Sequence, residues 1–204
     1  MSSCQIRALS LHQHVVPQVN EETLIKVMKA PLQRELKCAG FTAPVLKELA
    51  AVAHRGLQTL SLEYGDSSPE NIGMRVIATL AEQLPQLPVL VSFRFVVKDQ
   101  FAGWPPAADD AAAAALVWTL PAATDVTTEM LHPPVLVAPK ASTLAFETGY
   151  KIDLEDKDVA AAEAKTVALS TINSPLLTGL FVGVSDDLDI FEVASLPDDF
   201  ELAL

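Results

Sequence analysis

Cysteine and glycine are both scarce in this chain. Cys4 and Cys38 are its two cysteines, and they do not form a C-x-x-C pair. This excludes a disulfide-stapled scaffold and a C-x-x-C metal or redox site, and it favours a reducing compartment. Eight glycines stand against fourteen prolines. The chain is therefore expected to reverse direction often and to contain little flexible linker.

Long apolar runs are also missing. No stretch of 18 apolar residues occurs, so we expect no membrane-spanning helix. The N-terminus lacks a charged segment followed by a long apolar run, which predicts no secretory signal peptide. Half of the 204 residues are nevertheless hydrophobic and one fifth are charged. This balance is typical of a packed globular protein, and we expect one that is soluble and intracellular.

Basic residues are rare in the second half of the chain. Residues 1–100 contain ten Lys and Arg against nine Asp and Glu, whereas residues 101–204 contain four against seventeen. Contacts to phosphate groups need Lys and Arg. Any nucleic-acid contact is therefore expected in the N-terminal part, where the candidate residues are Lys26, Lys29, Arg34 and Lys37.

Enzyme motifs are absent as well. The sequence contains no GxSxG, GxxxxGK[ST], GxGxxG or HExxH pattern. His12 and His14 would share one side of an extended chain and could bind a metal, but no third ligand is identifiable, and His132 stands alone. Cys38 lies beside Lys37 without a recognisable base, which favours a buried structural thiol. We therefore predict no catalytic site, no metal site and no cofactor.

The N-terminal part has helical patterns. Capping residues and breakers predict helices over 21–30, 31–40 and 43–56. A further helix is predicted over 67–84, where Ser67 and Glu70 resemble a capping box. We interpret residues 1–56 as a helical N-terminal extension.

From residue 57 onward the pattern is mainly that of strands. Alternation is clear over 89–97, where Phe93 and Phe95 share a face and Arg94 lies on the other. Turn residues separate the strand-like runs, and the separators include 123–134 and 155–163. We detect no internal repeat. The eight predicted strands are 59–66, 89–97, 114–122, 133–140, 142–152, 165–172, 177–184 and 189–196.

Eight short strands at fairly even spacing predict a mainly β domain over 57–204, with an eight-stranded jelly-roll β-sandwich as the leading fold. Another Greek-key sandwich, or a separate helical subdomain, is the alternative. The acidic run "SDD" at 185–187 is interpreted as the turn between the last two strands.

The order of elements from residue 57 resembles the coat proteins of small icosahedral plant RNA viruses, and in particular the tymovirus-like group. A strand, a helix, a strand, a Pro-containing loop and the stretch "ALVWTLPAATDVTTEM" follow one another. Val117, Trp118, Pro121 and Ala122 approximate that group's apolar–Trp–x–Pro–Ala run, with one extra residue between Trp and Pro. "INSPLL" at 172–177 is similar to its C-terminal region.

The resemblance implies a structural capsid protein that self-assembles into an icosahedral shell enclosing RNA. Its location would be the virion and the host cytoplasm, and its partners would be its own copies. Viral RNA would be bound weakly and without sequence specificity by the basic residues named above, and no membrane contact is implied. Apolar residues in Pro-rich loops and in the tail are the candidates for the subunit interface: Phe101, Trp104, Met130, Leu131 and Phe200.

Two other functions remain open from the sequence. The chain could be a cellular β-sandwich module with a helical extension that binds a protein or a glycan. It could also be a metal-dependent jelly-roll enzyme acting through His12 and His14.

Overall fold

The structure is a computed structural model, and its strands form two parallel sheets. The residues that it describes are 8–11, 22, 34–39, 41, 44–48, 56–64, 73–97, 117–130, 133–148 and 157–184.

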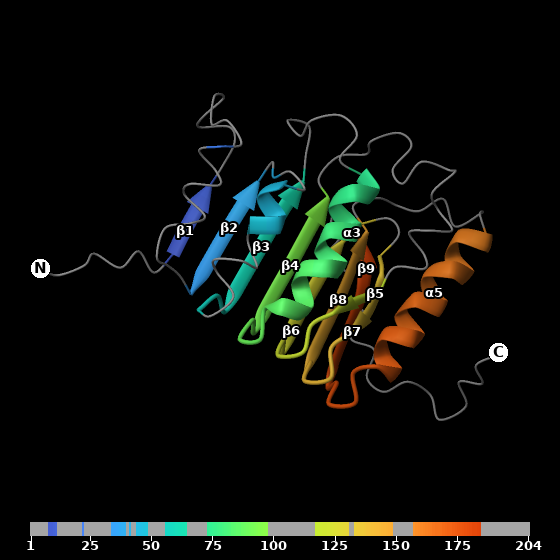
Figure 1. Ribbon diagram of the computed structural model, residues 1–204. Coiled ribbons are helices and arrows are strands. Elements are labelled where there is room, and N and C mark those ends of the chain that lie inside the picture. The colour runs from blue at the N-terminus through green and yellow to red at the C-terminus, as the bar shows by residue number, and fades with distance from the viewer. Residues whose placement is uncertain are drawn as a thin grey trace, which may run out of the picture.

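The larger sheet has seven strands, and their order in the sheet is their order in the chain (Figure 1). Each neighbouring pair is parallel. The strands are β1 (Ala8–Leu11), β2 (Glu35–Ala39), β3 (Thr59–Tyr64), β4 (Ser92–Val97), β6 (Asp125–Glu129), β8 (Thr143–Thr148) and β9 (Gly179–Val184).

A second layer covers one face of this sheet and returns the chain from the end of one strand to the start of the next. It consists of helix α3 (Gly73–Gln83), the short 3-10 helix η2 (Leu84–Gln86), strands β5 (Val117–Thr119) and β7 (Val135–Val137), and helix α5 (Lys157–Ile172). β5 and β7 pair in parallel, α3 contacts β5, and α5 contacts β7. In Figure 1, α3 lies in front of the large sheet and α5 lies at the right-hand end, next to β5 and β7. A solenoid has this architecture, because it repeats a unit of one strand and one return segment along a single axis.

We call one strand of the large sheet, together with the return segment that follows it, a coil. The same pattern of inward residues recurs in successive coils. Phe93 and Phe95 point into the core from β4, and the corresponding positions of β6 and β8 are Val126 with Thr128 and Leu144 with Phe146. The first inward residues of β4, β6, β8 and β9 are Phe93, Val126, Leu144 and Leu180. In each case, the residue three positions before it donates its backbone N–H to the carbonyl of the residue a further three positions back. These bonds are Leu90 to Leu87 (3.2 Å), Ala123 to Leu120 (3.4 Å), Ala141 to Ala138 (2.9 Å) and Leu177 to Ser174 (3.0 Å). The expectation of no internal repeat is therefore wrong at the level of structure.

The coils differ in length, which conceals the repeat. The equivalent positions Leu60, Phe93, Val126, Leu144 and Leu180 are separated by 33, 33, 18 and 36 residues. A search at one fixed period cannot align such units.

Neighbouring coils are also joined just before their strands begin. The Thr124 hydroxyl donates to the Val91 carbonyl at 3.4 Å, the Ser142 hydroxyl to the Thr124 carbonyl at 3.0 Å, and the Thr178 hydroxyl to the Ser142 carbonyl at 3.1 Å. Each hydroxyl donates a hydrogen bond to a backbone carbonyl of the preceding coil. The three side chains therefore join neighbouring coils just before the backbone bonds of the large sheet begin.

Trp118 is the centre of the core. Its fully buried ring packs edge-on against Phe93 and Phe95, at centroid distances of 5.7 and 5.2 Å, and its Nε1 donates to the Ile77 carbonyl at 3.3 Å. One side chain thus links β5 to β4 and to α3. Edge-to-face packing and a satisfied indole N–H are the favourable state for a buried Trp.

The mainly β class is confirmed, and most predicted elements are present. Strands lie within 59–66, 89–97, 114–122, 133–140, 142–152 and 177–184, and α3 lies within 67–84. Residues 44–48, within the predicted helix 43–56, are helical. The predicted strand 189–196 and the predicted helix 21–30, apart from Glu22, lie outside the described residues.

Four predicted elements are wrong. The predicted helix 31–40 contains β2, because Leu36 and Cys38 alternate into the core beside β3. The predicted loop 123–134 contains β6, whose inward positions are Val126 and the polar Thr128. The predicted loop 155–163 and strand 165–172 form the single helix α5, because the Ala-rich run 160–164 has a strong helical propensity.

The strand pairing also differs from the expected one. A jelly roll is built from antiparallel pairs, whereas every pair among the described strands is parallel. The extension expected over 1–56 likewise contributes β1 and β2 to the same large sheet.

Candidate interaction surface

The face of the large sheet that points away from the return layer is the most extensive candidate site, and we call it the outer face. Side chains alternate along each strand, so the residues between the inward positions belong to it. Two of these residues, Val96 and Ala145, are themselves buried. Most residues of the outer face are polar or charged. Its members are Glu35, Lys37, Thr59, Ser61, Glu63, Ser92, Arg94, Val96, Asp125, Thr127, Glu129, Thr143, Ala145, Glu147 and Phe181.

No helix among the described residues covers the outer face. α3, α5, β5 and β7 all belong to the opposite layer. Parallel sheets of compact α/β proteins are covered on both faces and are apolar on both. A parallel sheet with one apolar, covered face and one polar face is instead the arrangement that solenoids offer as a binding surface.

The outer face has an excess of negative charge. It carries five acids (Glu35, Glu63, Asp125, Glu129 and Glu147) and two bases (Lys37 and Arg94). Both bases are already paired within the face. Lys37 Nζ lies 3.1 Å from Glu35 Oε1, and Arg94 Nη2 lies 3.5 Å from Glu129 Oε2. The acids therefore exceed the bases by three, five against two.

The negative charge is concentrated over β6 and β8. Glu129 and Glu147 are register partners on these adjacent strands. Strands are about 4.8 Å apart, and like charges in that position repel. Asp125, at the start of β6, is exposed and accepts a hydrogen bond from the Ser92 hydroxyl at 3.3 Å. A positively charged group bound across β6 and β8 would relieve this repulsion.

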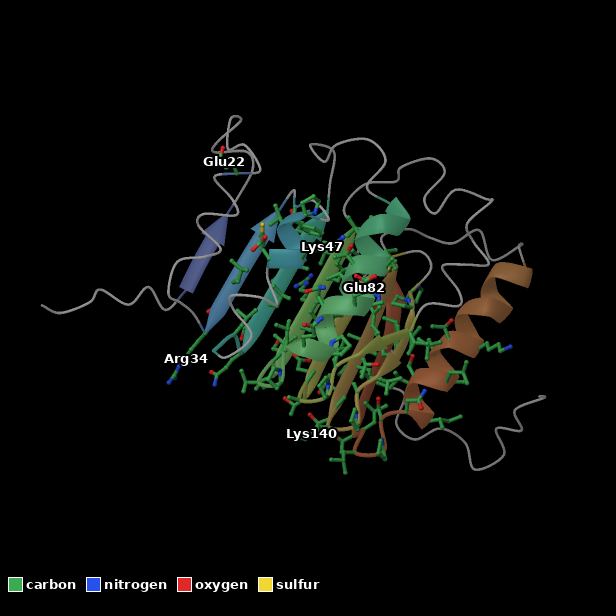
Figure 2. All side chains as sticks on the ribbon, in the orientation of Figure 1. Glu22, Arg34, Lys47, Glu82 and Lys140 are labelled. Carbon is green, nitrogen blue, oxygen red and sulfur yellow. The ribbon has the colours of Figure 1, made fainter. Side chains whose placement is uncertain are left out.

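The predicted phosphate-contacting residues are only partly described. Arg34 lies just before β2 and is exposed, and Figure 2 shows it pointing away from the sheet. Lys37 is on the outer face and pairs with Glu35. Arg34 therefore lies just before the start of β2, and Lys37 lies beside the acid Glu35. Lys26 and Lys29 lie outside the described residues.

Of the predicted subunit-interface residues, Met130 alone is described. It follows β6, its side chain is 3% exposed, and its backbone N–H donates to the Glu147 carbonyl at 2.9 Å. Met130 packs within its own chain, where its position extends the inward series of Val126 and Thr128. Its role at a subunit interface stays a prediction. The other four, Phe101, Trp104, Leu131 and Phe200, lie outside the described residues.

Within the described ranges, no three His, Cys, Asp or Glu side chains are grouped as metal ligands. His12, His14, His54 and His132 lie outside these ranges. Burial raises the pKa of the Cys38 thiol from 9.0 to about 12. At neutral pH the thiol is protonated, which is the opposite of what a nucleophile or a thiolate ligand requires.

The sequence did not reveal the cluster of acids on the outer face, because two of the five lie in a segment that was predicted to be a loop. Asp125 and Glu129 belong to β6, whose sequence "DVTTE" was interpreted as a turn. The signal that could have found them is the spacing shared by "LPVLVSFRF" and "LPAATDVTT". Aligning the two places Asp125 beside Ser92 and Thr127 beside Arg94, as the sheet does.

No protein-family model, no curated protein and no solved structure matches this chain. Among the described helices, none is long and apolar enough to cross a membrane.

Proposed function

We propose that this chain is a non-catalytic binding scaffold whose outer face binds a positively charged segment of a protein partner. The observation that carries the proposal is the polar, negatively charged face of a parallel sheet that the described return layer leaves uncovered. Of the functions compatible with the sequence, this is the binding-module alternative, with a solenoid in place of the β-sandwich.

The coil pattern supports a binding role. Leu57, Leu60 and Leu62 have the L-x-x-L-x-L spacing of leucine-rich repeats, and all three are buried. In such proteins the strands line an extended surface to which partners bind, and the repeats serve to build that surface. The coils described here have the same division between an apolar inner side and a polar strand face.

The charge of the face selects the class of partner. A surface with an excess of acids attracts Lys and Arg side chains, steers their approach and repels an acidic surface. Nucleic acid is disfavoured on this face for the same reason, because its phosphates would meet Glu129, Glu147 and Asp125.

Charge reversal on the outer face tests the proposal. The probe is an arginine-rich decapeptide, titrated into the full chain in a calorimeter at low salt. Glu147→Lys should weaken binding by roughly tenfold, because an attraction of about 0.5–1 kcal/mol becomes a repulsion of similar size. Asp125→Lys should act in the same direction.

Glu82→Lys is the matched control. Glu82 is exposed on α3, in the return layer, and Figure 2 labels it there. The substitution changes the net charge by the same amount as Glu147→Lys but lies on the opposite side of the sheet. Equal weakening by the two variants would mean that the peptide senses net charge alone, and the proposal would fail. Absence of any binding to the unaltered chain would have the same consequence.

The coat-protein hypothesis, with its jelly roll and its RNA, stays a prediction. The parallel pairing of the described strands lends it no support, and most of its interface residues lie outside the described ranges. Light scattering and electron microscopy of the purified chain distinguish the two hypotheses. Uniform particles of many subunits would favour the coat protein, whereas a stable monomer at high concentration would favour the scaffold.

A further inference from the structure

One base of the outer face lies where the basic segment of a partner would bind. Arg94 on β4 has Thr127 of β6 as its register partner, and Glu129 lies two residues further along β6. The Arg94 side chain reaches diagonally across to Glu129, so that Nη2 lies 3.5 Å from Oε2. Long side chains can reach diagonal neighbours in a sheet. The guanidinium therefore contacts the acid whose register partner on β8 is Glu147.

The two members of this ion pair differ in exposure. The Arg94 side chain is 52% exposed, whereas the Glu129 side chain is 13% exposed. A cation that approaches from solvent therefore meets the guanidinium before it meets the carboxylate. Since like charges repel, the cation gains the attraction of Glu129 in full when it takes the place of Arg94.

The other ion pair of the outer face has a different geometry. Lys37 and Glu35 are 54% and 39% exposed, so this acid keeps much of its surface in contact with solvent beside its own base. Glu35 also lies on β2, and β3 and β4 stand between β2 and β6 in the sheet. A partner bound across β6 and β8 has no need to displace Lys37.

The pair between Arg94 and Glu129 is weak enough to be exchanged. Ion pairs between partly exposed side chains contribute little, because solvent screens the charges and both side chains lose freedom. A half-exposed arginine can move its guanidinium into water while its stem stays along the sheet. A partner's base placed between Glu129 and Glu147 would contact two acids that repel each other, whereas Arg94 is paired with one of them.

We propose that Arg94 is an intramolecular competitor of the partner: it holds Glu129 in the unbound chain, and a basic side chain of the partner replaces it. This inference rests on the proposed function, since it assigns a regulating residue to the same face. Competition weakens the binding of every cation by the same factor. Arg94 thereby keeps weak cations off the face at concentrations at which a multiply charged segment still binds.

Removal of the competing charge is the first test. Arg94→Gln deletes the guanidinium and keeps much of the stem. With the arginine-rich decapeptide at low salt, this variant should bind roughly three- to fivefold more tightly than the unaltered chain, because no ion pair has to be broken. Lys37→Gln is the matched control, since it removes the same charge from the same face, and it should tighten binding by less than about twofold. Equal tightening by the two variants would mean that net charge alone matters, and the inference would fail.

A double-mutant cycle with Glu129→Gln separates competition from simple addition of charges. In the unaltered chain Arg94 already holds Glu129, so Glu129→Gln loses an acid but also removes the competition. In the Arg94→Gln background the same substitution only loses an acid, and the resulting weakening should be roughly three- to fivefold larger. Equal weakening in the two backgrounds would contradict the competition.

These outcomes can be told apart from failure of the proposed function. If the peptide binds the unaltered chain and Glu147→Lys weakens it, while Arg94→Gln and Lys37→Gln act alike, the outer face binds basic segments but Arg94 does not compete. If the peptide binds neither the unaltered chain nor Arg94→Gln, both proposals fail.

Discussion

At the scale of single residues, Lys37 and Cys38 show how a strand separates neighbours in sequence. Lys37 is exposed on the outer face, where it pairs with Glu35, while Cys38 is 4% exposed in the core. A lysine beside a cysteine in sequence suggests an activated thiol, because a nearby cation lowers a thiol pKa. Here burial dominates and raises the pKa of Cys38 to about 12. Alternation along a strand explains why the sequence neighbour has no such effect.

Cys38 should therefore be unreactive in the folded chain. In a Cys4→Ser background at pH 8, the remaining thiol should react with an aromatic disulfide reagent at least roughly 100-fold more slowly than in guanidinium chloride. The measurement is the rate of thiolate release. A native rate close to the denatured one would contradict the burial of Cys38.

The same raised pKa predicts a pH effect of known sign. As pH rises through 9.0, the unfolded thiol loses its proton while the folded thiol keeps it until about 12. The unfolded state is thereby favoured, and the contribution of Cys38 to stability falls between these two values.

At the scale of elements, a serine joins α5 to β7 within the return layer. Ser170 is fully buried, its Oγ accepts a hydrogen bond from the Leu136 N–H of β7 at 2.9 Å, and it donates to the Thr166 carbonyl at 2.8 Å. The residue next to it, Thr171, donates to the Val167 carbonyl of its own helix at 2.9 Å. The first hydroxyl joins two elements, and the second lies within one.

Ser170→Ala should lower the free energy of unfolding by about 1–3 kcal/mol, because it leaves the buried Leu136 N–H without its acceptor. Thr171→Ala, the control, should change it by less than about 0.5 kcal/mol, since that hydroxyl bonds only within the helix. Urea denaturation measures both. Similar losses for the two variants would show that the bond between α5 and β7 has no special weight.

The elements that the sequence predicts correctly have a clearer apolar pattern than those that it does not. Local signals identified β3, β4 and α3, whose apolar periods are clear. β2 and β6 are short, and their inward residues include Cys38 and Thr128, so a period of two is hard to see without knowing their neighbours. The segment 165–172 contains β-branched residues, which favour a strand. It nevertheless forms part of helix α5, which packs against β7.

At the scale of the whole molecule, the mainly β class follows from the sequence, but the direction of pairing does not. Short strands separated by breakers are compatible with antiparallel sandwiches and with parallel coils alike. The distinguishing feature is the return segment, and here one return is a helix while the next is a strand of three residues, β5. This irregularity conceals the repeat, and with it the alignment that places Glu129 beside Glu147.

The central claim is that the outer face binds a basic segment, and carboxyl labelling tests it most directly. The full chain is labelled with a water-soluble carbodiimide and an amine, with and without the arginine-rich decapeptide, and the modification of each acid is quantified by mass spectrometry. The account predicts that the peptide protects Asp125, Glu129 and Glu147 while Glu82 on α3 is labelled equally in both samples. Protection of Glu82 to the same degree, or unchanged labelling of the outer-face acids, would contradict it.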